Sequence, residues 1–343
     1  MASAAADPNE HTIASYNMSW ANSAGFHTKG DSEILLDEAD KPVRTRVTEY
    51  FFIKRAKEAR QFWNKALKHL NDFVVAKNPS FIGIQEAGRI KDFKKLPCFE
   101  TEGYHINESK QRFETLHTIW RKDLGEPIEI MEEDSGIEFG EVGRPIVGIY
   151  TSNGFLLVNC HLPWGEDKGS KDKWFKKAQQ EYLSTFLQPF FDKYLINLSK
   201  LFIVGDFNYE SYLASNPLQL RQVTLTGGNR APAASCCHTD SRQQIAAYVR
   251  GNDYCFGLNV VEELKVLPSP IDETGEFGMP GGSVASDHEL VYATFKSSSV
   301  AGGSRRSKRS LLRSRGSRRV RRMTKKRSRP FKNRCHRIIR QIH

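Results

Sequence analysis

Five short polar segments of this chain combine side chains that bind divalent cations with side chains that handle phosphate. They are Tyr16-Asn17, Gln85-Glu86, Asn159-Cys160-His161, Gly205-Asp206-Phe207-Asn208 and Ser286-Asp287-His288. All but the last follow a β-branched or aromatic run, as Phe81-Ile82-Gly83-Ile84 precedes Gln85-Glu86. At a strand end a side chain leaves the core while its backbone stays fixed. If these ends converge, they give a rigid site of oxygen ligands and imidazoles, which suits magnesium-assisted phosphodiester chemistry.

The elements that must position these segments alternate between strands and helices. The apolar pattern predicts long helices over 48–77 and 172–194 and a short one near 90–96, and it places an acidic loop at 132–134. Asn78-Pro79 should stop the first helix, and Ser152-Asn153-Gly154 should turn a hairpin. Strands are expected at 12–16, 81–85, 115–120, 145–150, 155–159, 201–204, 254–258 and 289–295. This order predicts an α/β fold in which two packed sheets are flanked by helices.

The net charge of +11 is concentrated in one segment. Residues 301–343 hold 18 of the 51 Lys and Arg and no acidic residue, so residues 1–300 carry 33 basic against 40 acidic side chains. We therefore expect three parts, namely a flexible leader at 1–10, one catalytic domain at 11–296 and a disordered Arg/Lys/Ser-rich tail at 297–343. A body of this size can bury one large core.

Targeting signals and cysteines point to an intracellular protein. No apolar run is long enough to cross a bilayer, and the N-terminus lacks the features of a secretory signal. The six cysteines show no paired spacing, and two fall in predicted strands, so we expect reduced thiols. Cys236-Cys237-His238 lacks a second ligand pair and favours a buried or loop-lining role over a metal site. The basic tail adds the expectation of a nuclear location, or of one at another site of nucleic acid.

Each polar segment alone also has an ordinary structural interpretation. A single Gly-Asp-x-Asn is usually a turn, because Asp and Asn bond to their own backbone there. Gln-Glu after a strand is often a helix cap or a surface pair, and His161 is equally compatible with a satisfied core histidine. The five segments share a position at strand ends and occur together in this order along the chain. The simplest explanation for that combination is that all five contribute to one site.

With these five segments the chain resembles the endonuclease/exonuclease/phosphatase superfamily, whose fold is that of deoxyribonuclease I. The resemblance covers about residues 11–296. It implies a four-layered α/β sandwich of two packed mixed β-sheets flanked by helices. The site is then expected at one end of the two sheets.

The resemblance also implies a metal set and a water-positioning pair. Asn17, Glu86 and Asp287 resemble the residues around Mg²⁺, for which Mn²⁺ is an expected substitute. Asp206 and Asn208 resemble the pair that positions and activates the attacking water. Alternation along an extended backbone would put both of their side chains on the same side.

Two imidazoles complete the implied site. His288 resembles the imidazole over the scissile phosphate, with Asp253 as the carboxylate that fixes its tautomer. His161 resembles a second imidazole at a phosphate oxygen or the leaving group. Arg144 is a further candidate phosphate contact by its proximity along the hairpin, and a structural arginine is an equal alternative.

This chain departs from the sequence patterns of some branches of the superfamily, and these differences narrow the range of expected substrates only in part. Abasic-site endonucleases typically carry asparagine where this chain has His161, and the strings typical of inositol phosphatases are absent around 204–210 and 251–254. The histidine fits the deoxyribonuclease, deadenylase, tyrosyl-phosphodiesterase and sphingomyelinase branches alike.

The basic tail favours a polyanionic partner. Our first hypothesis is a Mg²⁺-dependent nuclease or DNA/RNA phosphodiesterase that the tail tethers to its polymer. The same tail resembles a nuclear localisation signal that binds import receptors. The alternatives are a phosphatase or sphingomyelinase-like phospholipid phosphodiesterase, and a non-catalytic nucleic-acid-binding scaffold. A membrane is the less favoured target, and the oligomeric state stays open.

Overall fold

The fold is given by a computed structural model. It describes residues 7–18, 35–36, 42–44, 49–87, 90–100, 103–109, 115–135, 144–163, 170–208, 251–268, 271–272, 283–284, 286 and 288–297. The chain divides into two units, Met1–Ser299 and Val300–His343. The second unit lies outside the described residues, as do Cys236-Cys237-His238 and Asp287. Of the expected tail at 297–343, only Ser297 is described.

The first sheet has six strands in the order β12-β15-β1-β4-β6-β5. β1 runs parallel to β4, and both have antiparallel neighbours on their other sides. Parallel pairing means that β1 and β4 end at the same edge of the sheet. The strands are β1 (Glu10–Asn17), β4 (Phe81–Gln85), β5 (Tyr104–Glu108), β6 (His117–Arg121), β12 (Val260–Leu267) and β15 (Leu290–Lys296).

The second sheet has five strands in the order β11-β10-β9-β8-β7. β9 and β10 form its parallel pair, and β8 and β9 form the predicted hairpin. The strands are β7 (Pro127–Asp134), β8 (Pro145–Thr151), β9 (Leu156–His161), β10 (Leu201–Asp206) and β11 (Asp253–Phe256). Two short pairs stand apart, namely β2 (Leu35–Leu36) with β3 (Pro42–Arg44) and β13 (Ile271–Asp272) with β14 (Ser283–Val284).

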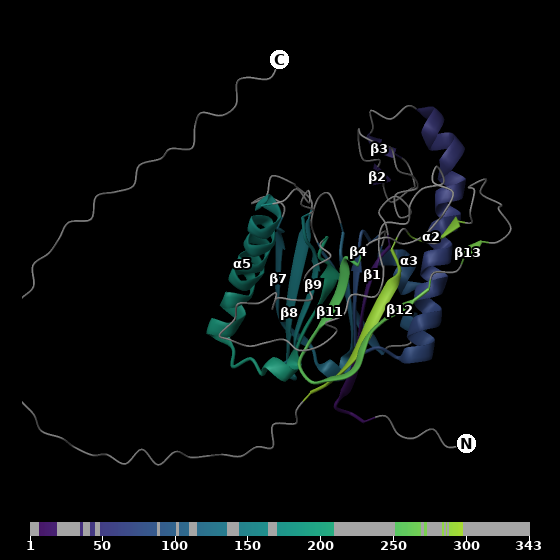
Figure 1. The fold of residues 1–343 in the computed structure, drawn as a ribbon. Coiled ribbons are helices and arrows are strands. Elements are labelled where there is room, and N and C mark those ends of the chain that lie inside the picture. The colour runs from purple at the N-terminus through teal and green to yellow at the C-terminus, as the bar shows by residue number, and fades with distance from the viewer. Residues whose placement is uncertain are drawn as a thin grey trace, which may run out of the picture. The chain divides into compact units, whose positions relative to one another are not determined.

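Two long helices cover the outer faces of the sheets, α2 (Glu49–Lys77) on the first and α5 (Ser170–Lys193) on the second (Figure 1). α2 ends where predicted, because Asn78 adopts a left-handed φ of 43° and its N–H still bonds to the Val74 carbonyl. The shorter helices are α3 (Ile90–Lys94), α4 (Pro97–Glu100), and the 3₁₀ turns η1 (Lys122–Leu124) and η3 (Leu198–Lys200). Among the described residues, no helix is both long and apolar enough to cross a membrane.

Three apolar cores lie between these layers. One joins α2 to the first sheet, one lies between the sheets, and one joins α5 to the second sheet. Neighbouring residues of one strand serve different cores, as Ile146 faces α5 while Val147 faces the other sheet. Phe186 and Phe190 of α5 are almost fully buried, which stabilises the fold by about 1.5–3 kcal/mol for each side chain. The layer order confirms the predicted four-layered α/β sandwich.

The predicted acidic loop at 132–134 is wrong, because these residues form the end of β7. They pair with Pro145, Ile146 and Val147 of β8. β7 is the last strand of its sheet, so it has room for acidic side chains that an inner strand would not accept. The edge strands β5 and β12 escaped prediction for the same reason, since their mixed burial gives no continuous apolar run.

Buried cysteines in the described residues are free thiols. Cys98, Cys160 and Cys255 make no disulfide. Burial raises the pKa of the Cys160 and Cys255 thiols well above the ordinary range, so both are inert at neutral pH.

The described residues of the expected leader contact the end of the last strand. Asp7 forms a 2.6 Å ion pair with Lys296, and the Asn9 carbonyl accepts a bond from the Ser297 N–H. The domain boundaries at 10 and 297 remain a prediction.

Candidate active site

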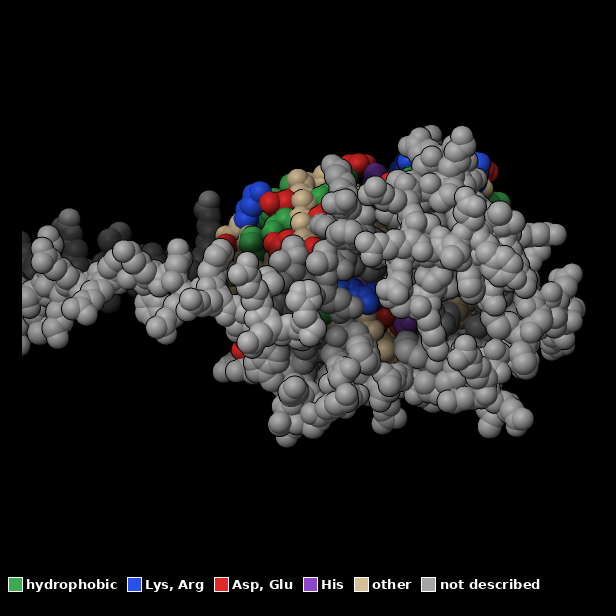
Figure 2. All heavy atoms as spheres, turned by 90° about the horizontal axis from the view of Figure 1, so that it is seen from above, with side chains coloured by type: hydrophobic (Ala, Val, Ile, Leu, Met, Phe, Trp, Pro, Cys, Tyr) green, Lys and Arg blue, Asp and Glu red, His purple; other side chains and the backbone are tan. Residues whose placement is uncertain are grey.

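The functional side chains come from strand ends that meet at one edge of the two sheets. In the second sheet, Asp206 is the register partner of His161 on one side and of Asp253 on the other. In the first sheet, Asn17 pairs with Gln85, the residue before Glu86. Figure 2 looks down on this edge and shows basic, acidic and histidine side chains close together. The predicted convergence of strand ends is what the structure shows.

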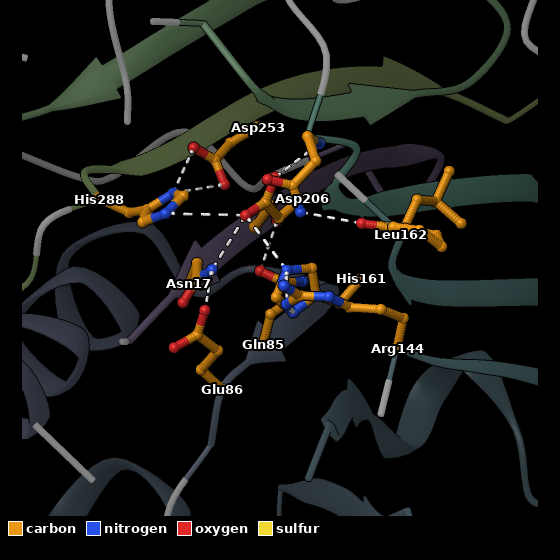
Figure 3. A network of polar contacts seen from close by, with 12 residues as sticks. Asn17, Gln85, Glu86, Arg144, His161, Leu162, Asp206, Asp253 and His288 are labelled. Carbon is orange, nitrogen blue, oxygen red and sulfur yellow. Dashed lines mark hydrogen bonds and ion pairs between the residues drawn. The ribbon is translucent and has the colours of Figure 1, made fainter. Parts of the chain in front are cut away.

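The carboxylate of Asp206 is the meeting point of both sheets. Its Oδ2 accepts a 3.0 Å hydrogen bond from Asn17 Nδ2, and it lies 3.6 Å from His161 Nε2 and 3.7 Å from His288 Nε2. Figure 3 shows these three side chains pointing toward it. Asp206 is 1% exposed. One buried carboxylate oxygen therefore faces an amide and two imidazoles.

His288 is held from behind by Asp253, as predicted. Its Nδ1 lies 3.0 Å and 3.3 Å from the two carboxylate oxygens, and both side chains are buried. An ionised carboxylate only accepts hydrogen bonds, so Nδ1 carries the proton of this pair. That tautomer leaves Nε2 as the nitrogen that faces Asp206. The pair thus orients one imidazole toward the centre of the site.

His161 is a buried imidazole beside a guanidinium. Arg144 Nη1 donates to His161 Nε2 at 2.7 Å and lies 3.3 Å from Nδ1. Burial, followed by the charge of Arg144, lowers the pKa of His161 to about 4. At neutral pH His161 is therefore an uncharged ring, and Arg144 supplies the fixed positive charge on this side of the site.

Glu86 turns into the site at a strained backbone position. Its φ is 48°, a left-handed conformation that costs a non-glycine residue on the order of 1–3 kcal/mol. The strain is enforced on both sides, because the Gln85 carbonyl accepts from Met18 N and the Ala87 N–H donates to the Thr115 carbonyl. Asn17 Nδ2 donates to Glu86 Oε1 at 3.2 Å. The strand end thus brings a second carboxylate to the amide that also contacts Asp206.

The expectation that 206–208 form an extended backbone is wrong. β10 ends at Asp206, and Asn208 has a φ of 52°, which asparagine tolerates better than most residues. The Asn208 N–H donates to Asp206 Oδ1 at 2.8 Å, and its side-chain amide donates to the Leu162 carbonyl at 2.8 Å. Alternation fails because the Asx turn competes with the strand. Asn208 still lies at this edge, beside the residue that follows His161.

Gly205 is required for the same local structure. A Cβ at this position would collide with the Cys160 carbonyl oxygen of the neighbouring strand. Any other residue would push β10 away from β9 at the point where Asp206 and His161 are register partners.

Two groups of side chains are suited to a divalent cation. Asn17 and Glu86 offer the amide and carboxylate oxygens that hard cations prefer, while Asp287, the third predicted ligand, lies outside the described residues. A second group was not predicted as metal-binding, and its ligand atoms lie within 4.8 Å of one another, namely Asp206, Asp253 and His288. In this second group the His288 Nδ1 is hydrogen-bonded to Asp253, and the His288 Nε2 faces Asp206.

The sequence reasoning gave no role to several polar residues of its own motifs. Ser286 is fully buried; its hydroxyl donates to the Asn17 carbonyl at 2.8 Å and accepts from the His288 N–H at 3.1 Å. It therefore ties the end of β1 to the loop that carries His288. Ser15, Gln85 and Asn159 are equally buried. The available signal was a polar side chain inside an otherwise apolar strand, one or two residues before a predicted site residue.

Comparisons with known proteins agree at the level of fold. TDP2 from C. elegans superimposes with a TM-score of 0.50 and 14% identity, over 84% of this chain and 75% of that chain. The human Nocturnin catalytic domain with bound sulfate anion gives 0.46 and 14% over 83% and 94% of the two chains. An endonuclease/exonuclease/phosphatase family protein from Bacteroides thetaiotaomicron gives 0.46 and 16% over 84% and 98%. No family model and no curated protein sequence matches the chain.

Proposed function

We propose, from the deoxyribonuclease I-like fold that this chain shares with the endonuclease/exonuclease/phosphatase superfamily, that it is a metal-dependent phosphodiester hydrolase. The observation that carries the proposal is the buried Asp206 carboxylate facing Asn17, His161 and His288. Three strand ends from two sheets, together with the segment just before β15, supply this cluster. A scaffold without catalysis has no need to hold two imidazoles against one buried carboxylate.

The described side chains divide into three roles in this proposal. Asp206 orients the attacking water and accepts its proton, with Asn208 holding the turn that aims the carboxylate. His288, fixed by Asp253, presents Nε2 toward the same centre. His161 and Arg144 face the phosphate oxygens, where the arginine charge stabilises the negative charge that develops during attack.

Arg144 is the side chain that substrate would move. A phosphate oxygen is a stronger acceptor than a neutral imidazole nitrogen, so we expect the guanidinium to turn from His161 to the bound phosphate. That exchange removes the donor from His161 Nε2, so the neutral ring can carry its proton on Nε2 and donate it to the phosphate or the leaving oxygen.

Asn17 and Glu86, with Asp287 as a further candidate, would hold Mg²⁺ or Mn²⁺. When bound, the ion would supply positive charge for the phosphate and the departing oxygen. The fit rests on the ligand atoms present, which are the amide oxygen of Asn17 and the carboxylate oxygens of Glu86. The Asn17 Nδ2 donates to Glu86 Oε1 at 3.2 Å and so holds the two side chains together.

Nucleic acid is the substrate class that we propose. The support is the tail composition, with 18 cations and no anion in residues 301–343, which suits a polyphosphate chain and predicts salt-dependent binding. The same segment suits an import receptor, which fits the proposed nuclear location. Both uses are compatible.

The test is a substrate panel with the purified full-length chain. We expect cleavage of labelled single- or double-stranded DNA or RNA with Mg²⁺ or Mn²⁺, and none with EDTA. Failure to cleave any of the four polymers would overturn the nucleic-acid assignment. Metal-dependent release of headgroup or phosphate from lipid vesicles or small esters would then favour the alternative of a phosphatase or a sphingomyelinase-like phospholipid phosphodiesterase.

A C-terminal truncation distinguishes the contribution of the tail from that of the candidate active site. Removal of residues 300–343 should weaken polymer binding and flatten its salt dependence while sparing a small diester. The cut belongs after Ser299, since Ser297 still bonds to His11 and to the Asn9 carbonyl in the folded unit. Loss of the small-diester activity as well would show that the tail contributes to the site.

A further inference from the structure

Behind the candidate active site, a chain of buried hydrogen bonds crosses from one sheet to the other. Ser15 Oγ of β1 donates to Gln85 Oε1 of β4 at 3.2 Å, and Gln85 Nε2 donates to Asn159 Oδ1 of β9 at 2.7 Å. All three side chains are 0% exposed. The second bond joins the two sheets directly, in a region where the other inter-sheet contacts are mostly apolar.

The orientation of the Asn159 amide is fixed by its other partners. Its Nδ2 lies 3.3 Å from the Ile84 carbonyl and 3.1 Å from the His117 carbonyl. Carbonyls only accept hydrogen bonds, so Nδ2 must face them and Oδ1 must face Gln85. A flipped amide would place its oxygen against these acceptors. The Gln85–Asn159 bond therefore has one direction and one geometry.

A glycine at position 83 leaves room for the bond between Gln85 and Asn159. A Cβ on Gly83 would lie 2.6 Å from Asn159 Oδ1 and would collide with Val204 Cγ2. Residue 83 therefore has to be glycine for the amide of β9 to reach the edge of β4.

Each of these three residues lies one or two positions before a residue of the site. Gln85 is followed by Glu86, while Ser15 and Asn159 lie two residues before Asn17 and His161. Residues two apart on a strand point to the same side. Fixing Gln85 against Asn159 thus fixes the ends of β4 and β9 relative to each other. Apolar packing alone is not directional and would allow the two sheets to slide along their strands. This directional hydrogen bond fixes how far the strands of one sheet are shifted relative to those of the other.

We propose that Gln85 and Asn159 are positioning residues for the reaction, and that their bond across the sheets holds Glu86 and His161 at the separation that the metal and the phosphate require. This inference rests on the proposed function. Neither residue touches substrate; Gln85 acts through Glu86, the next residue, and Asn159 acts through His161, two residues further along β9.

The test is the double variant Gln85→Met with Asn159→Leu in the full-length chain. These side chains nearly conserve volume and remove both ends of the Gln85–Asn159 bond together. Ser15 Oγ and the Ile84 and His117 carbonyls also lose a partner, so we expect a lower melting temperature with melting still cooperative. We expect Mn²⁺ affinity, measured by the paramagnetic resonance of the free ion, to fall about 10-fold or more. With a small diester, kcat should fall about 10- to 100-fold with little change in KM.

The matched control is Thr151→Val. Thr151 is also 0% exposed, and its hydroxyl donates to the Leu124 carbonyl at 2.6 Å, at the end of β8 farthest from Arg144. It should lose stability through the missing hydrogen bond while keeping Mn²⁺ affinity and kcat. If the double variant melts without cooperativity, the single variant Gln85→Met replaces it in the test. Its Mn²⁺ affinity and kcat are measured in the same way, and it leaves the bonds of Asn159 Nδ2 in place.

The outcomes separate the two proposals. Wild-type Mn²⁺ affinity and kcat in the double variant would overturn the positioning role and leave the proposed function intact. Absence of Mn²⁺ binding and of cleavage in the wild-type chain would overturn the proposed function and this inference with it. Equal losses in Thr151→Val would show that the effect follows general destabilisation and would also overturn the positioning role.

Discussion

Two buried histidines at opposite edges of the sheets allow a comparison between an imidazole outside the candidate active site and one inside it. His11 lies near the start of β1, and His161 ends β9 at the candidate active site. Burial is the largest cause of a lowered pKa in both, and both values are about 4. A depressed pKa therefore does not tell them apart.

The difference lies in the partners. The ring nitrogens of His11 bond to the hydroxyls of Ser80 and Ser297, at 3.3 Å and 2.9 Å. His161 instead contacts a guanidinium at 2.7 Å and a carboxylate at 3.6 Å. Neutral partners satisfy a ring and hold it still, whereas charges of both signs create a site that a charged ligand can reorganise.

Of the substitutions that test this comparison, Asp206→Asn should have the largest effect on the rate of hydrolysis. It keeps the shape of the side chain but replaces the carboxylate that faces both imidazoles, so we expect kcat to fall about 10³-fold. Asp123→Asn is the matched control, because Asp123 is an exposed acid near the start of β7, where it pairs with Arg121. Initial rates on a small diester provide the measurement. Equal rates in the two variants would remove Asp206 from the mechanism.

Arg144→Met should have the next largest effect. Loss of the phosphate-facing charge should lower kcat/KM about 10²-fold, and Arg144→Lys should recover part of it. Arg144 also lowers the pKa of His161, so the same variant should raise that pKa. Titration of the His161 ring by nuclear magnetic resonance checks this direction. An unchanged pKa and unchanged rates would make Arg144 a structural residue.

His11→Gln should leave turnover unchanged and alter only stability. The folded pKa of His11 lies below the ordinary value of 6.5, so between about pH 6.5 and 4 the unfolded chain binds the extra proton. Its contribution is complete above pH 6.5 and is lost as the pH falls toward 4, by about 3 kcal/mol. Denaturant unfolding at pH 7 and pH 4 should show a smaller difference in the variant. A drop in kcat would contradict the assignment of His11 to the structural edge.

Most of the fold could be predicted because its inner strands are continuous apolar runs. Phe81–Gln85, Leu156–His161 and Leu201–Asp206 are buried at every position, and their ends carried the motifs. The mixed edge strands could not be predicted this way. Pro127–Asp134 carries four acidic residues and forms a strand only because β8 offers it a partner.

The site was predictable in its residue types and less so in its geometry. The pairing of His288 with Asp253 agrees with the prediction. The extended conformation of 206–208 does not, because the Asp206 side chain bonds to the Asn208 N–H and turns the chain. The supporting residues Gln85 and Asn159 had no predictable role, since their bond joins strands that are 74 residues apart.

The amino-acid sequence by itself determined which side chains stand at strand ends and which chemistry they could carry out, because strand periodicity and residue chemistry are local properties. Only the tertiary structure decided that one oxygen of Asp206 is the common point and that the side-chain amides of Gln85 and Asn159 meet across the two sheets. The physical reason is that the relative height of two packed sheets depends on contacts between residues far apart in the chain. No local pattern encodes that distance.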